Sequence, residues 1–173
     1  LFLMARMWPV LAGTSEWFYL VATTGLVTML VAAGIALFTD DLKGLLAYST
    51  VSHLGLVTML LGFGTPLAAV AAVFHILNHA TFKAALFMNA GIVDHEAGTR
   101  DIRRLGGLLQ LMPITATMAM VAGASMAGLP PLNGFISKEM MLHEAVDTSW
   151  LGNGWIVAAL ATLAACLSVA YSF

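Results

Sequence analysis

The stretch FYLVATTGLVTMLVAAGIALF, residues 18–38, contains no charged side chain. A helix needs about 20 consecutive apolar residues to cross a hydrocarbon core of about 30 Å. The whole chain has the same character: of its 173 residues, 60% are hydrophobic and 9% are charged, and the mean hydropathy is +0.92. Soluble domains carry roughly 25% charged residues. The composition therefore excludes a soluble globular protein and predicts an all-α, polytopic transmembrane helix bundle.

Further spans flank this stretch on both sides. We expect residues 1–12 to be the end of a helix that is closed by the Trp8-Pro9 pair, and Glu16 to lie in a short polar connection. The chain begins with Leu rather than Met and ends inside an apolar run, so we expect one transmembrane domain that is a fragment of a longer subunit. After residue 38 the predicted spans are 42–63, 67–93, 108–146 and 154–173.

The segment 108–146 is too long for one straight span, because a helix of this length would reach about 58 Å. The sequence GLPPLNG at 128–134 interrupts it. Proline removes a backbone donor, and non-helical backbone survives inside a membrane only where it lines a cavity of the protein. We therefore expect a discontinuous helix whose break contains Gly128, Pro130, Pro131 and Gly134.

Charge and cysteine content exclude several functions. The chain has 7 Lys and Arg against 9 Asp and Glu, a net charge of -2, so it has no basic surface for nucleic acid. The single Cys166 offers neither a disulfide framework nor a metal cluster. Phosphate-binding and dinucleotide-binding motifs and a carboxylate cage for a metal are also missing from the sequence. We expect no cofactor and no enzyme activity, and a driving force that comes from an ion gradient or a partner subunit.

The cationic loops indicate an orientation. When the spans alternate, loops 39–43 and 94–107 fall on the same side of the membrane, and the opposite loops carry no Lys or Arg. The positive-inside rule makes the first side cytoplasmic. Its cations are Lys43, Arg100, Arg103 and Arg104.

Three titratable residues form a stripe along the predicted helix 67–93. His75, His79 and Lys83 are spaced i, i+4, i+8, and each step rotates about 40° and rises about 6 Å. Hydrocarbon disfavours the ammonium form of a lysine, and histidine titrates near neutrality, so such residues can exchange protons. Ionisable residues within a membrane usually mark ion pathways. The stripe predicts a proton relay; the alternative is that the histidines only join helices and Lys83 extends to an interface.

Lys138 lies within one turn of the predicted break and is the best single candidate for a functional residue. Broken helices expose helix ends and free carbonyls that can hold ions near the midplane of the membrane. Glu139 and His143 can pair at i, i+4, and Glu144 is a further possible charge partner. In the alternative interpretation, residues 138–147 are a polar helix end that emerges into water.

The predicted span 42–63 carries two more candidates. His53 lies about 15 Å beyond Lys43 along the helix axis, which places it near the middle of the membrane. Lys43 lies beside two aspartates, so it is either an anchor at the interface or a member of the relay.

Three long strings carry a family resemblance. DLKGLLAYST at 41–50, FHILNHATFKA at 74–84 and GLPPLNGFISKE at 128–139 resemble the antiporter-like, proton-conducting subunits of respiratory complex I, membrane hydrogenases and Mrp-type cation/proton antiporters. The loop IVDHEAGTRDIRRLGG at 92–107 is most similar to the A subunit of the Mrp type.

The resemblance implies paired five-helix inverted repeats, each with one broken helix, of which this chain holds most of the second. Lys138 would be the end of a proton path, and the His75, His79 and Lys83 stripe would link it to the centre. Lys43 and His53 match positions in the preceding helix. The implied function is proton translocation in a multisubunit Na⁺ or K⁺/proton antiporter of a bacterial inner (cell) membrane, with other membrane subunits as partners.

Two alternatives remain open. The chain could belong to a proton-pumping subunit of NADH:quinone oxidoreductase or of a membrane-bound hydrogenase, and genes for iron-sulfur subunits would then lie nearby. An inert membrane scaffold is the third possibility. It predicts that substitutions of the polar stripe disturb assembly rather than transport.

Overall fold

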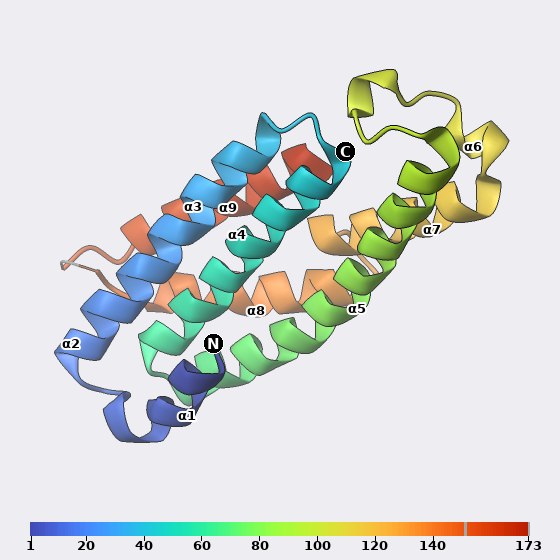
Figure 1. Ribbon diagram of the computed structural model, residues 1–173. Coiled ribbons are helices and arrows are strands. Elements are labelled where there is room, and N and C mark those ends of the chain that lie inside the picture. Colours follow the sequence, from blue (N-terminus) through green and yellow to red (C-terminus); the bar gives the residue numbers. More distant parts are fainter. Residues whose placement is uncertain (151, 173) are drawn as a thin grey trace.

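The chain folds into a bundle of antiparallel helices (Figure 1). The computed structural model describes residues 1–150 and 152–172. Its helices are α1 (Phe2–Leu11), α2 (Ser15–Trp17), α3 (Thr23–Leu37), α4 (Leu42–Phe63), α5 (Pro66–Ala97), α6 (Leu108–Leu111), α7 (Pro113–Ala127), α8 (Asn133–Asp147) and α9 (Ile156–Ser172). The all-α prediction is confirmed.

Three helices in the described part of the chain are long and apolar enough to cross a membrane: Ser15–Leu37, Leu42–Phe63 and Pro66–Ala97. The first joins α2 to α3 through a π-helical turn at Phe18–Ala22, and it starts three residues before the predicted span. Glu16 therefore lies in the first helical turn, not in a connection. Shorter apolar helices include α1, α7 and α9.

Local capping fixes the ends of α4 and the start of α5. The Asp41 carboxylate accepts a hydrogen bond from the Gly44 amide at 2.7 Å, and the Thr65 hydroxyl accepts one from the Ala68 amide at 3.1 Å. Each satisfies a donor that the first turn leaves free. Gly64 ends α4 with a φ of +75°, a conformation that glycine adopts without strain. Helix α4 thus has the same bounds as the predicted span 42–63.

Other boundaries differ from the predictions. Helix α1 does not end at the Trp8-Pro9 pair but continues to Leu11, because proline keeps a helical φ and costs only one donor. Helix α5 continues four residues beyond 93, so the polar loop begins at Gly98, whose φ is +66°. Helix α9 begins at Ile156, and residue 173 of the predicted span 154–173 lies outside the described residues.

The segment 108–146 is interrupted twice rather than once. Pro113 starts α7, and proline disfavours a helical conformation in the residue before it, so α6 ends ahead of Met112. The predicted break then follows at Gly128, with a φ of +86°. The chain becomes helical again at Asn133, so Gly134 lies in the first turn of α8 and not in the break.

The two loops predicted to share one side of the membrane are hydrogen-bonded to each other. The Leu42 amide donates to the Arg100 carbonyl and the Ile102 amide to the Asp40 carbonyl, both at 2.9 Å. In the same loop, Arg103 donates to the Asp101 carboxylate and holds its pKa below the ordinary value.

Helices α3 and α4 pack backbone to backbone, side by side in Figure 1. A Cβ at Gly55 would lie 2.6 Å from the Met29 nitrogen and 2.8 Å from the Gly25 carbonyl oxygen, and a Cβ at Gly25 would collide with the Met59 nitrogen. Small residues at helix crossings allow such close approach in membranes. This contact aligns the inner face of α4, which carries His53.

We expect Gly55→Ala to force these backbones apart and to destabilise the protein by about 1–3 kcal/mol, the usual cost of overpacking. Gly34→Ala is the matched control, because a Cβ there meets nothing within 4 Å on the same pair of helices. Thermal unfolding in detergent, followed by tryptophan fluorescence, should show a lower midpoint for Gly55→Ala alone. Equal midpoints for both variants would contradict the close packing.

Candidate functional site

A cluster of polar side chains lies inside the bundle. Burying such groups costs free energy unless they are hydrogen-bonded. The buried ones, each at most 7% exposed, are Ser49, Ser52, His53, His75, Asn78, Lys83, Ser125, Ser137, Lys138, Glu144 and Ser168. They come from helices α4, α5, α7, α8 and α9, so the fold brings together residues that are far apart in the sequence.

Two histidines form the centre of the cluster. His53 Nδ1 of α4 and His75 Nε2 of α5 are 3.0 Å apart, and their rings stack at an interplanar angle of 12°. The second nitrogen of His75 lies 3.1 Å from the Ser137 hydroxyl, which donates to the Gly134 carbonyl at 3.1 Å. The pair thus connects α4, α5 and the first turns of α8.

Lys83 and His79 extend the cluster along α5. The Lys83 ammonium donates to the Leu46 carbonyl at 3.2 Å and to the Ser49 hydroxyl. The His79 ring centroid lies 5.4 Å from that of His53 and 6.3 Å from that of His75. Its Nε2 is buried without a hydrogen-bond partner in the described part of the chain. The predicted stripe of His75, His79 and Lys83 therefore faces α4. This arrangement fits the expectation that the three residues share one face of α5.

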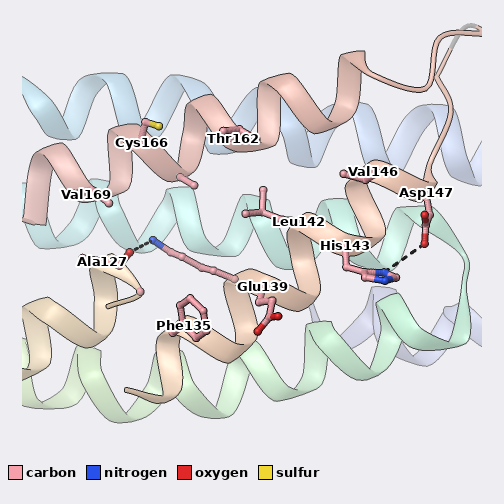
Figure 2. Close-up of a pocket in the computed structure, with 13 residues that line it drawn as sticks. Ala127, Phe135, Glu139, Leu142, His143, Val146, Asp147, Thr162, Cys166 and Val169 are labelled. Atoms are coloured by element: carbon pink, nitrogen blue, oxygen red, sulfur yellow. Dashed lines mark hydrogen bonds and ion pairs between the residues drawn. The ribbon is translucent and has the colours of Figure 1, made fainter. Parts of the chain in front are cut away.

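Lys138 lies at the break, as its sequence position suggested. Its ammonium donates to the Ala127 carbonyl at 2.9 Å, marked by the dashed line at Ala127 in Figure 2, and to the Ser168 hydroxyl at 2.7 Å. Ala127 is the last residue of α7, so the break frees this carbonyl from the helix. A Cβ at Gly128 would lie 2.8 Å from Lys138 Cδ. Glycine at this position therefore gives the lysine its space.

A pair of asparagines holds the break against α5. Asn133 Nδ2 donates to Asn78 Oδ1 at 3.0 Å, and Asn78 Nδ2 donates back to the Asn133 carbonyl at 3.2 Å. The Ser125 hydroxyl donates to Asn133 Oδ1 at 2.6 Å. Sequence reasoning missed this contact, although the asparagine inside the GLPPLNG string was its signal.

The possible charge partners predicted after the break, Glu139, His143 and Glu144, are not among the hydrogen-bond partners of Lys138 in the described residues. Glu139 is exposed, and His143 pairs with Asp147 at 3.3 Å instead of with Glu139 (Figure 2). Glu139 and Asp147 each lie one turn from His143. The histidine pairs with the acid that follows it and not, as predicted, with the acid that precedes it. Glu144 is buried and accepts a hydrogen bond from the Thr65 hydroxyl, the N-cap of α5. Within residues 1–150 and 152–172, the hydrogen-bond acceptors of Lys138 are neutral.

Lys43 lies outside the buried cluster. Its ammonium is 2.7 Å from Asp94 Oδ2, and Arg100 Nε is 3.8 Å from the other oxygen of that carboxylate. The side chains of Lys43 and Asp94 are 38% and 32% exposed. This network joins the start of α4 to the end of α5 at the polar loop.

A groove of about 570 Å³ lies between α8 and α9 (Figure 2). Its lining is largely apolar and includes Phe135, Leu142 and Val169, together with Lys138 and the exposed Cys166. The groove therefore reaches the buried Lys138, whose ammonium is hydrogen-bonded inside the bundle.

Sequence reasoning also missed three hydroxyls: Ser137, Ser168 and Tyr171. Tyr171 OH lies 3.4 Å from His53 Nε2. A spacing of i, i+3 for polar residues in an otherwise apolar span was the available signal on α9.

Known proteins with similar sequences and structures identify the family. The chain is 63% identical over 172 residues to the A/B subunit of a probable K⁺/H⁺ antiporter of Rhizobium meliloti (strain 1021), covering 99% of this chain and 17% of that protein. It is 46% identical over 191 residues to the A subunit of the Na⁺/H⁺ antiporter of Alkalihalophilus pseudofirmus, covering 99% and 24%. The chain thus spans about a fifth of the length of these curated relatives.

A solved structure agrees with the sequence relatives. The Mrp complex from Dietzia sp. DQ12-45-1b contains a chain with 45% sequence identity and a TM-score of 0.93, matched over 99% of this chain and 19% of that one. The family described as NADH:quinone oxidoreductase/Mrp antiporter, transmembrane, matches residues 1–168. With this match over nearly its whole length, the chain belongs to the NADH:quinone oxidoreductase/Mrp antiporter transmembrane family.

Proposed function

We propose that this chain is part of the proton-translocating membrane subunit of a multisubunit Na⁺ or K⁺/proton antiporter. The names of its relatives, which include both cations, support this assignment. The observation that carries it is the buried cluster: two lysines, Lys83 and Lys138, lie on either side of a histidine pair, and every hydrogen-bond acceptor of either ammonium within the described residues is neutral.

This environment suits both protonation states of each lysine. Burial disfavours the ammonium, whereas a carbonyl and a hydroxyl stabilise it through two hydrogen bonds. After losing a proton, a neutral amine can still donate to the carbonyl and can accept from the hydroxyl. A salt bridge with a carboxylate would instead hold the proton. A membrane potential supplies about 2.3 kcal/mol per charge per 100 mV, which is sufficient to move such an equilibrium.

The proposed path runs from Lys138 through His53 and His75 to His79 and Lys83. The histidine rings lie with centroids 5.2–6.3 Å apart, within reach of direct transfer or transfer through one water molecule. Lys43 is assigned to the anchoring role, because Asp94 neutralises it at the polar loop.

A redox-driven proton pump is the second candidate. The family description includes NADH:quinone oxidoreductase, and the same lysines and histidines would serve that activity. Purification of the intact complex distinguishes the two, since iron-sulfur subunits should accompany only the redox enzyme. The third possibility, an inert scaffold, requires that removal of the buried charges leaves transport unchanged.

We expect Lys138→Ala and Lys83→Ala, each made in the full-length subunit of the assembled complex, to lower cation-dependent proton flux about 100-fold, the scale of a lost proton-transfer group. Flux is measured in inverted vesicles with a pH-sensitive dye. Arg104→Ala, in the exposed loop, is the control and should retain flux. Wild-type flux in both lysine variants would rule out the proposed function.

We also expect Gly128→Ala to reduce flux about tenfold or more, because its Cβ would displace Lys138. Gly98→Ala provides the comparison, since Gly98 also has a positive φ but a Cβ there meets nothing within 4 Å. Both variants carry the backbone penalty, and only Gly128→Ala moves the lysine. A similar flux in the two variants, at equal amounts of assembled complex, would disprove the steric role of Gly128.

A further inference from the structure

Helix α9 lies against the buried cluster, and two of its hydroxyls have partners there. Ser168 accepts a hydrogen bond from the Lys138 ammonium at 2.7 Å, and Tyr171 OH is 3.4 Å from His53 Nε2. The two residues are spaced i, i+3, so their side chains lie on the same face of α9. One helix thus contacts both Lys138 and the histidine pair.

The direction of each hydrogen bond around the histidines is set by the Gly134 carbonyl, the acceptor at the end of this series of hydrogen bonds. The Ser137 hydroxyl donates to the Gly134 carbonyl, which cannot donate in return. Ser137 must therefore accept from His75 Nδ1–H, which leaves Nε2 of the neutral His75 ring as an acceptor for His53 Nδ1–H. In a neutral His53 ring the remaining Nε2 is then an acceptor, and the group beside it is the Tyr171 hydroxyl.

A small cavity joins this hydroxyl to Lys138. Its volume is about 10 Å³, which is the lower limit of the space that one water molecule needs. A buried water needs two to four polar partners, and the polar residues that line the cavity are Ser52, His53, Lys138, Ser168 and Tyr171. The remaining lining is apolar, so the polar groups of this cavity lie together between Lys138 and His53.

We propose that Tyr171, with Ser168 and one water molecule in this cavity, forms the proton-transfer link between Lys138 and His53. This inference rests on the proposed function and adds α9 to the path. In the transfer, the Tyr171 O–H bond breaks as a proton moves to His53 Nε2. The tyrosine oxygen regains a proton from the water, which regains one from the Lys138 ammonium through Ser168. The lysine ends neutral and the imidazole protonated, so charge is conserved.

The test is Tyr171→Phe in the full-length subunit of the assembled complex, with proton flux measured in vesicles in H₂O and in D₂O. This variant removes the hydroxyl and keeps the ring. We expect the flux to fall about tenfold and the solvent isotope effect to rise, because positioned proton transfer is lost. Thr162→Val is the matched control on the same helix, since the exposed Thr162 hydroxyl only bonds the Ala158 carbonyl. It should retain flux and isotope effect.

A second pair of variants covers the case in which Tyr171→Phe does not assemble. Ser168→Ala should lower the flux about tenfold, and Ser168→Thr, which restores a hydroxyl, should recover it. Two results would overturn the link and leave the proposed function intact. The first is equal flux in Ser168→Ala and Ser168→Thr. The second is wild-type flux and isotope effect in Tyr171→Phe while Lys138→Ala is inactive. If Lys138→Ala and Lys83→Ala are also fully active, the proposed function fails together with the link.

Discussion

The hydrogen bond from Lys138 to the Ala127 carbonyl is the interaction on which the site depends. A continuous helix consumes its carbonyls internally, so only a helix that stops inside the bundle offers one to a side chain. A free carbonyl away from water must in turn find a donor. The lysine and the break therefore require each other, since the break supplies an acceptor and the lysine satisfies it. The hydrogen bond from Ser125 to Asn133 joins the two half-helices, and the asparagine pair holds the break against α5.

Hydropathy and charge were sufficient to predict an all-α bundle with long apolar helices such as α3, α4 and α5, and a helix break at Gly128. These features follow from the composition of single segments, and α4 in particular has the predicted ends because Asp41 and Gly64 are local signals. The predicted end of α5 was wrong because a charged residue does not by itself end a helix. Asp94 belongs to α5 because a charged residue can lie in a helix that has left the hydrocarbon, and the helix ends only where Gly98 adopts a positive φ.

The hydrogen-bond partners of the cluster could not be predicted, because they depend on contacts between helices. Most hydroxyls in these helices bond the backbone of their own helix, as Thr24, Thr28, Thr58 and Thr162 do. Ser168 has the same chemistry as Thr162, yet it faces Lys138. Only the packing of α9 on α8 distinguishes the two. The direction in which His143 pairs was undetermined for a similar reason, since an acid lay one turn away on each side.

The backbone contact between α3 and α4 limits how the bundle can move. Side chains normally form a deformable layer on which packed helices slide by small steps. At Gly25 and Gly55 this layer is missing, so the backbones meet directly and a sliding step would require the two helices to separate. The ion pair of Lys43 and Asp94 joins the start of α4 to the end of α5. Residues 128–132 lie between the end of α7 and the start of α8, so the segment that frees an acceptor for the lysine also sets the direction in which α8 leaves α7.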